Sequence, residues 1–184
     1  MERKGGCRMD YLYHYESPLG GITLKSDGDA LTGLWFDGPD RCAGTHNPAE
    51  KEKAPPVLRE TERWLDVYFG GREPGFTPKL NMRGTPFQRA VWEAMLAIPY
   101  GRTVTYGELA RRIADRPPFL RASARAVGGA AGRNAVLLVI PCHRVVGAGG
   151  RLAGYAGGPG RKAILLELER TGTGAFSAPD IHIP

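Results

Sequence analysis

A stretch rich in glycine and proline, residues 70–81, separates two parts of this 184-residue chain that differ in pattern and in charge. A stretch of this kind is typical of a connection between structural units, and the chain length suits one large domain or two small ones. Residues 1–81 carry 11 Lys and Arg against 13 Asp and Glu, a net charge of −2, whereas residues 82–184 carry 14 against 6, a net charge of +8. We therefore predict two domains, 1–81 and 82–184, with the basic character confined to the second.

The first part has the pattern of a small antiparallel sheet followed by one helix. Three short runs have β-like composition, and the turn sequence SDGD separates the last two: 11–15, 21–25 and 31–36. Residues 37–56 are polar, rich in proline and without a period, which predicts an exposed loop. From Leu58 to Phe69 apolar residues recur at helical spacing, and two glycines end the pattern. We interpret the aromatic residues of this helix, Tyr68 among them, as core packing.

The second part opens with three predicted helices. Thr85 and Thr105 each begin a capping box, in which a glutamine or glutamate stands three residues later. A third helix is expected over 120–131, with Arg121 and Arg125 on one side. Two short helices after a longer one, with arginines on the last, are typical of a helix-turn-helix DNA reader. The expected turn between the second and third helices is longer than is usual for that motif.

The rest of the second part contains one apolar run and one further helix. Residues 135–140 are apolar throughout and predict a buried strand. A glycine-rich stretch, residues 147–160, precedes a final helix around Leu165, and the tail 171–184 shows no period. The whole pattern predicts an α+β fold, with a small antiparallel sheet and a helix in the first domain and a helical DNA-binding unit in the second.

The basic residues of the second part point to a polyanionic partner. Of its 14 cations only Lys162 is a lysine, and the planar fork of arginine suits phosphates, base edges and stacking. Charge alone leaves a solvated basic surface as the alternative. The longest apolar run, 135–141, is too short to span a bilayer, and residues 1–10 lack the apolar core of a signal peptide. We expect a cytoplasmic protein with no membrane partner.

The three cysteines form an odd set without the spacing of a disulfide framework. This argues against a stapled secreted domain and leaves at least one free thiol. Four residues of the first part are conceivable zinc ligands, but their spacing matches no Cys/His framework, so no metal is expected: Cys7, His14, Cys42 and His46.

The third cysteine, Cys142, stands next to a candidate base. A thiol is a good nucleophile only as the thiolate, and a histidine polarised by a carboxylate is a common means of forming one near neutral pH. The sequence Pro-Cys-His-Arg at 141–144 brings together the thiol, His143 and a cation at the end of the predicted strand. An isolated Cys-His pair is, however, more often an inert core thiol beside a satisfied histidine.

The sequence around this pair resembles the methylated-DNA:protein-cysteine methyltransferases, also called alkylguanine-DNA alkyltransferases. The resemblance rests on RAVGGA at 125–130 followed by N-x7-CHRVV at 134–146. It extends from GTPF at 84–87 through IPYG at 98–101 and VTY at 104–106 to Gly154-Tyr155 and the final helix. It implies a ribonuclease-H-like α/β first domain, a winged helix-turn-helix-type second domain, and transfer of an alkyl group from O6-alkylguanine to the protein.

The resemblance assigns the reacting groups as follows. Cys142 is the nucleophile and acceptor, His143 helps to deprotonate it through water, and Glu169 polarises the imidazole. Asn134 matches the residue that stabilises the loop around the thiol and the bound base. Tyr106 matches the hydroxyl that donates a proton as guanine leaves. No cofactor is expected, and each molecule would react once.

DNA contacts follow from the same resemblance. Arg125 matches the arginine that enters the duplex stack in place of the flipped nucleotide, and Arg121 is expected to bind DNA beside it. Tyr155 belongs to the loop that lines the alkyl pocket. The partner is double-stranded DNA that contains alkylated guanine, and a monomer is expected.

Two departures and two alternatives remain open. Leu137 and Ala156 stand where some members of the family carry Pro and Ser, which leaves the width of the alkyl pocket open. A damage sensor that binds DNA without reacting is one alternative, although such proteins replace the acceptor cysteine. A cysteine hydrolase with an unrelated substrate is the other, but it gives no account of the arginines on the third predicted helix.

Overall fold

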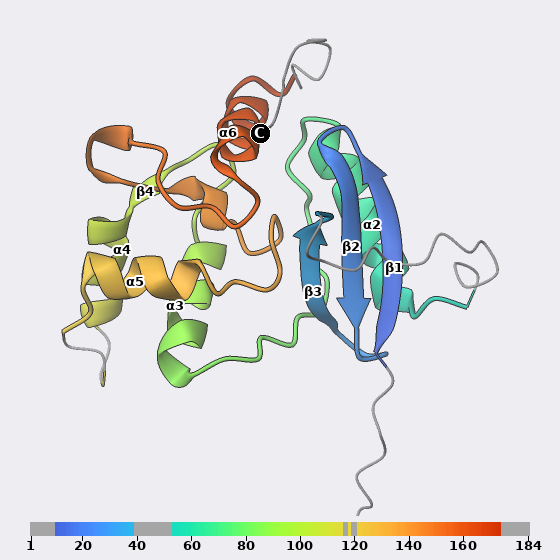
Figure 1. Ribbon diagram of the computed structural model, residues 1–184, viewed down its shortest axis with the longest axis horizontal. Helices are drawn as coiled ribbons and strands as arrows, with labels where there is room; N and C mark the ends of the chain where they lie inside the picture. Colours follow the sequence, from blue (N-terminus) through green and yellow to red (C-terminus); the bar gives the residue numbers. More distant parts are fainter. Residues whose placement is uncertain (1–9, 39–52, 116–117, 119–120, 174–184) are drawn as a thin grey trace, which may run out of the picture.

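The computed structural model describes residues 10–38, 53–115, 118 and 121–173. Figure 1 shows a sheet and its helix on one side of the molecule, a group of helices on the other, and the helix α6 (Pro159–Thr171) near the top between them. The first side contains β1 (Tyr11–Ser17), β2 (Gly20–Ser26), β3 (Leu31–Phe36) and α2 (Pro56–Phe69). The remaining elements are α3 (Pro86–Leu96), β4 (Val104–Thr105), α4 (Tyr106–Ala114), α5 (Ala124–Ala131), η1 (Cys142–Arg144), β5 (Val145–Val146), η2 (Ala148–Gly150) and α6 (Pro159–Thr171). The predicted α+β class is confirmed, and the boundary near Asn81 stays a prediction.

The predicted three-stranded antiparallel sheet is present, in the order β1-β2-β3. Its second turn follows the SDGD signal: the Asp27 carboxylate accepts hydrogen bonds from the backbone N–H groups of Asp29 and Ala30, and Gly28 has a φ of +95° that favours glycine. Ile22 and Leu24 of the central strand are fully buried. Most of the expected 37–56 loop lies outside the described residues.

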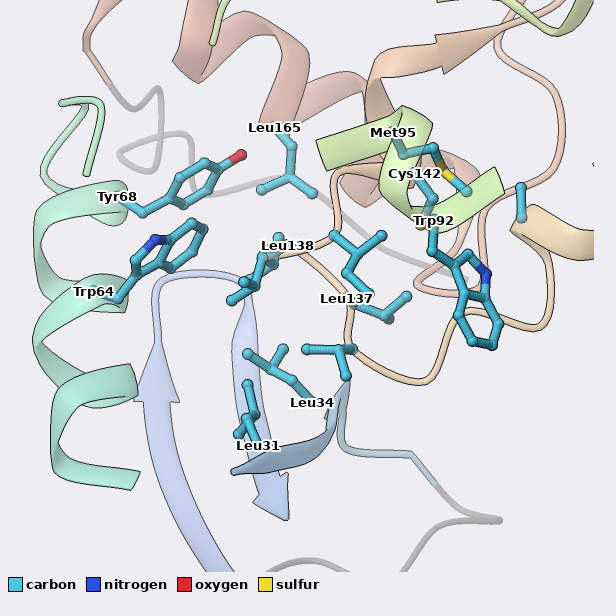
Figure 2. Close-up of a cluster of buried hydrophobic side chains, with 14 of the residues drawn as sticks. Leu31, Leu34, Trp64, Tyr68, Trp92, Met95, Leu137, Leu138, Cys142 and Leu165 are labelled. Carbon is cyan, nitrogen blue, oxygen red and sulfur yellow. The ribbon is translucent and has the colours of Figure 1, made fainter. Parts of the chain in front are cut away.

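Helix α2 packs against this sheet as its apolar spacing predicts. Leu58, Leu65 and Tyr68 are fully buried, and the rings of Trp64 and Tyr68 stack 5.1 Å apart at 9°. Figure 2 shows these two parallel rings projecting from α2 into the cluster of apolar side chains. Core packing is therefore confirmed for the aromatic residues of this helix.

The free edge of β3 is covered by two segments from later in the chain. Leu31 donates to Lys79 O at 2.8 Å and accepts from Asn81 N at 2.9 Å. Leu34 donates to Ala135 O at 2.8 Å and accepts from Leu137 N at 2.9 Å. The segment that leads to Cys142 is thereby attached to the sheet through the backbone.

The expected strand over 135–140 is wrong: only Val136 forms a bridge, to Leu34, and the chain then turns. Leu138 has a φ of +66°, and Val139 N donates to Leu137 O at 2.7 Å across it, which is the hydrogen bond of a γ-turn. The run is buried, as Figure 2 shows for Leu137 and Leu138. Burial explains its apolar composition, and composition alone cannot distinguish a short buried strand from buried turns.

The helical side begins as its sequence signals predict, with one correction. Both capping boxes are formed, at Thr85 with Gln88 and at Thr105 with Glu108. The third helix starts at Ala124 rather than at residue 120, because the Ser123 side chain caps it by accepting from Ala126 N at 3.2 Å. Arg121 therefore precedes α5. Parts of the preceding turn and the tail 174–184 lie outside the described residues.

Candidate active site

Cys142 begins the short helix η1, directly after a tight turn at Pro141. Cys142 N donates to Ile140 O at 2.8 Å around Pro141, whose φ of −81° and ψ of 64° are those of an inverse γ-turn. The side chain is 4% exposed. Burial raises the pKa of the thiol to about 11, against the lowering effects of the Asn134 hydrogen bond and the Lys162 charge. The resting thiol is therefore protonated at neutral pH and needs a base.

Asn134 holds the thiol and its loop together. Its Nδ2 donates to Ile140 O at 2.9 Å and lies 3.3 Å from Cys142 Sγ, while its Oδ1 accepts from Val136 N at 2.9 Å. One side chain thus joins both ends of the turn to the sulfur. A hydrogen bond donated to sulfur favours the thiolate over the thiol.

His143 is fully buried, and its two ring nitrogens have different surroundings. Nε2 lies 2.6 Å from Glu169 Oε1, which assigns the ring proton to this nitrogen. Nδ1 is buried and has no hydrogen-bond partner among the described residues, so its lone pair is free to accept a proton. Burial lowers the pKa of the imidazole, and the hydrogen bond and charge of Glu169 oppose that effect. The neutral ring is a candidate base for the adjacent thiol.

The Glu169 carboxylate, on α6, is surrounded by donors. Arg144 Nε donates to Oε2 at 2.9 Å, Gly101 N donates to Oε2 at 2.9 Å, and the Tyr68 hydroxyl donates to Oε1 at 2.8 Å. Burial alone would raise the pKa of this carboxyl, but the hydrogen bonds and charges of His143 and Arg144 outweigh burial and lower it to about 2. The group stays ionised and can stabilise a positive charge on His143.

Two tyrosines lie near the thiol. The Tyr106 hydroxyl, at the start of α4, donates to Ala153 O at 3.0 Å, and the Tyr155 ring meets His143 edge to face with centroids 6.2 Å apart. Burial raises the pKa of both phenols, and a negative charge on Cys142 raises them further. Both tyrosines therefore keep their protons and can donate them.

Arg121 and Arg125 lie on the surface, apart from the buried groups. Arg125 stands one helical turn before Gly128 on α5, and a Cβ on Gly128 would lie 3.8 Å from the Tyr106 ring. Residues three apart share a helix face, so Arg125 lies beside the part of α5 that packs on Tyr106. The guanidinium is thus exposed next to the buried site.

Comparison with known proteins decides the family. The chain matches the 6-O-methylguanine DNA methyltransferase ribonuclease-like domain over residues 11–82 and the DNA binding domain of the same family over residues 86–171. The chain belongs to the 6-O-methylguanine DNA methyltransferase family. The methylated-DNA–protein-cysteine methyltransferase of Mycobacterium tuberculosis is 41% identical over 165 residues, which cover 87% of this chain and 94% of that protein. That of Methanosarcina acetivorans is 41% identical over 160 residues, covering 86% and 97%.

Solved structures of this methyltransferase family have the same fold. The crystal structure of Mycobacterium tuberculosis OGT in complex with DNA is 40% identical and covers 90% of this chain and 96% of its own, with a TM-score of 0.74. The M. tuberculosis O6-methylguanine methyltransferase structure gives a TM-score of 0.72 at 40% identity and covers 91% and 96%.

In this methyltransferase, sequence reasoning missed the contacts that three residues make in the site. Arg144 binds Glu169 and also donates to Ile98 O at 2.7 Å; its place in the Pro-Cys-His-Arg sequence was the available signal. Lys162 is fully buried and donates to Val145 O at 2.6 Å and Ala153 O at 2.8 Å. The available sign in the sequence was that Lys162 is the only lysine among the 14 cations of residues 82–184. For the third, Tyr68, helical spacing gave no sign beyond core packing.

The remaining expectations concern metal and pocket residues. Of the four conceivable zinc ligands only His14 lies in the described part of the chain, where its Nε2 is 2.8 Å from Glu16 and its Nδ1 is 3.0 Å from Asp37. Among the described residues no group of three or more His, Cys, Asp or Glu is placed to hold a metal ion. No helix in the same residues has the length and apolar character needed to cross a membrane. Leu137 is buried against the sheet, and Ala156 is exposed in the loop after Tyr155.

Proposed function

We propose that this protein repairs alkylated DNA by moving the alkyl group from O6 of a guanine to Cys142, once per molecule. The observation that carries the proposal is the buried thiol next to a histidine whose Nε2 is bound to an ionised glutamate and whose Nδ1 is free. Family membership supports the reaction type and DNA as the partner.

The reaction balances with groups of this chain. His143 Nδ1, acting through water, accepts the thiol proton, and the Nε2 hydrogen bond to Glu169 stabilises the resulting imidazolium. Cys142 Sγ attacks the alkyl carbon, so that a carbon–sulfur bond forms and the carbon–O6 bond breaks. The electron pair of the broken bond stays on guanine, and Tyr106 donates a proton to it. The proton on His143 replaces the tyrosine proton through solvent.

Two consequences follow from this chemistry. An exocyclic oxygen in a base stack cannot reach a buried sulfur, so the nucleotide must leave the duplex, and Arg125 is placed to occupy the vacated space. The product is a thioether, whose sulfur is a poor leaving group for water to displace. Turnover therefore stops at one transfer for each molecule.

Mass spectrometry of peptides after mixing with an O6-methylguanine oligonucleotide tests the proposal. The Cys142 peptide should gain one methyl group, with at most one equivalent for each protein molecule. An unmodified Cys142 peptide in protein that has bound the DNA would leave a non-reacting sensor as the function. Turnover of small substrates without any need for DNA would indicate a hydrolase.

The Cys142→Ala variant separates chemistry from recognition. Because Asn134 is the one side chain in the described part of the chain that hydrogen-bonds the thiol, the variant should bind methylated DNA with unchanged affinity and transfer nothing. A folded variant that no longer binds DNA would contradict the division of roles. We further propose that the protein acts as a monomer in the cytoplasm, where its DNA substrate lies.

A further inference from the structure

One buried hydroxyl from the sheet side of the molecule reaches the reactive groups of the helical side. Tyr68 lies at the end of α2 and is fully buried. Its hydroxyl is 2.8 Å from Glu169 Oε1 and 3.1 Å from His143 Nε2. These are the two atoms that face each other in the His143–Glu169 pair, at 2.6 Å. The hydroxyl thus completes a triangle of three polar atoms from α2, η1 and α6.

We propose that Tyr68 is a positioning residue for the transfer reaction, whose hydroxyl keeps the proton of His143 on Nε2 and thereby keeps Nδ1 available as the base. The hydroxyl has one hydrogen, which it donates to Glu169, so its oxygen faces Nε2 only as an acceptor. A ring with the proton on Nδ1 would turn a bare Nε2 toward the Glu169 carboxylate, and the hydroxyl could donate to this nitrogen only by giving up its hydrogen bond to Glu169. That arrangement is repulsive, and the correct tautomer is favoured.

The surroundings of Tyr68 fix its hydroxyl in place. The ring stacks on Trp64, meets Phe69 edge to face at 5.5 Å, and meets His143 edge to face at 6.2 Å. Figure 2 shows the Tyr68 ring stacked on Trp64, with Leu165 on its other side. A side chain packed on several sides loses little further freedom when its hydroxyl bonds, so it can orient a partner precisely enough for catalysis.

Several other groups face the imidazole and set its charge together with Tyr68. They are Glu169 and Lys162 from α6, Arg144 and Cys142 from η1, and Tyr155 from the following loop. Lys162 and Arg144 disfavour the imidazolium, whereas Glu169 favours it. When Nδ1 accepts the thiol proton, the Tyr68 oxygen still faces a donating Nε2–H, so the hydroxyl also stabilises the charged ring.

The Tyr68→Phe variant tests this role, which rests on the proposed function. Single-turnover transfer should slow about tenfold at pH 7, the effect of one hydrogen bond at a charged group. The pH of half-maximal rate should rise because thiol deprotonation loses part of its stabilisation. DNA affinity should not change. An unchanged rate and midpoint, or a midpoint that falls, would overturn the role, as would a slower rate with an unchanged midpoint.

The matched control is Tyr13→Phe. Tyr13 is a buried residue of the same sheet side, and its hydroxyl donates to the Glu62 carboxylate at 2.7 Å, away from the thiol. This variant should lose stability without any change in the rate midpoint. In a Glu169→Gln background the Tyr68→Phe change should slow transfer less than twofold, since the two groups act as a unit. Full additivity would show that Tyr68 acts on packing alone.

A second measurement is independent of DNA. Nitrogen-15 chemical shifts of the His143 ring at pH 7 should show a proton on Nε2 in the wild type and a mixture of tautomers in Tyr68→Phe. Identical shifts in both would overturn the proposal. If the wild type itself fails to transfer a methyl group, the proposed function fails, and the ring shifts still decide whether Tyr68 sets the tautomer.

Discussion

The buried cluster around Glu169 and the exposed face of α5 each contain an arginine, but the two arginines differ in burial and in the number of partners. In the cluster Arg144 is 8% exposed and donates to Glu169 and to Ile98 O. On α5 Arg125 is exposed, one helical turn before Gly128, which faces the Tyr106 ring. The interactions of a buried charge are strong, and the loss of one partner costs much stability. The interactions of a surface charge are screened by solvent, so its substitution costs little stability. We therefore expect changes in the cluster to affect stability and chemistry together, and removal of an exposed charge on α5 to affect DNA binding alone.

Removing the charge of Glu169 should have the largest effect. Glu169→Gln leaves the buried Arg144 without its anion, which should lower the free energy of unfolding by about 3 kcal/mol. It should also slow transfer by at least about 100-fold, because the imidazolium loses its counter-charge. Urea unfolding and single-turnover kinetics measure the two effects.

The control for this change lies two residues away on α6. Glu167 is exposed and pairs with Arg170 at 2.5 Å, so Glu167→Gln should leave stability and transfer unchanged. Equal losses of stability and transfer rate in the two variants would contradict the expected difference between buried and exposed carboxylates.

Acid should destabilise the cluster through the same carboxylate. The pKa of Glu169 is about 2 in the folded chain, below its usual value of 4.5, so the folded state binds fewer protons than the unfolded state in that interval. The stabilisation is fully present above about pH 4.5 and is lost as the pH falls toward 2, with a total of about 3 kcal/mol. Urea midpoints measured across this range should fall steeply for the wild type and less steeply for Glu169→Gln. Parallel curves would show that other carboxyl groups dominate acid unfolding.

On the exposed face, Arg125→Ala should weaken binding to methylated duplex DNA about tenfold and leave the free energy of unfolding unchanged. Gel-shift titration and urea unfolding give the two values. Arg59→Ala, an exposed arginine on α2, is the control and should not change DNA affinity. A drop in stability for Arg125→Ala would mean that the guanidinium has a structural role.

The smallest effect is expected at the start of the same helix. Ser123→Ala removes the side chain that caps α5 and should cost about 1 kcal/mol of stability, with a modest loss of DNA affinity as the first turn loosens. Ser123→Gly should cost less than alanine, since glycine is an acceptable N-cap. Thermal unfolding resolves the order. If alanine were the better residue, the helix start would be fixed by tertiary contacts instead.

The helices of the second domain and the buried cluster around Glu169 also differ in how far the sequence predicts them. The capping boxes at Thr85 and Thr105 are local signals, and both helices begin where they indicate. Ser123 is also a cap by residue type, but the predicted start of this helix was at residue 120, before the cap. The cluster depends on tertiary contacts: Tyr68 and Glu169 are 101 positions apart, and no pattern within α2 indicates that its tyrosine meets a carboxylate.

The segment before Cys142 shows a second limit of sequence reasoning. Its apolar residues predicted burial correctly and a strand incorrectly, because the left-handed conformation of Leu138 leaves no trace in composition. The family resemblance predicted that Cys142, His143 and Glu169 act together, and the structure places His143 in contact with Glu169 and next to the thiol. The resemblance could not indicate that Nδ1 of His143 has no partner among the residues that the structure describes while Nε2 has two, since that follows only from packing.

The backbone hydrogen bonds that Leu34 makes with residues 135 and 137 join the two sides of the molecule. They also have a consequence for the order in which the chain folds during synthesis. The three strands of the sheet are synthesised before residues 135–137. Until those residues are added, part of the edge of β3 is unpaired and can form backbone hydrogen bonds with another extended chain. Residues 79–81 cover one end of this edge, and the segment that leads to Cys142 covers the other. The last step in covering this sheet edge therefore also attaches the chain before Cys142 to the first domain.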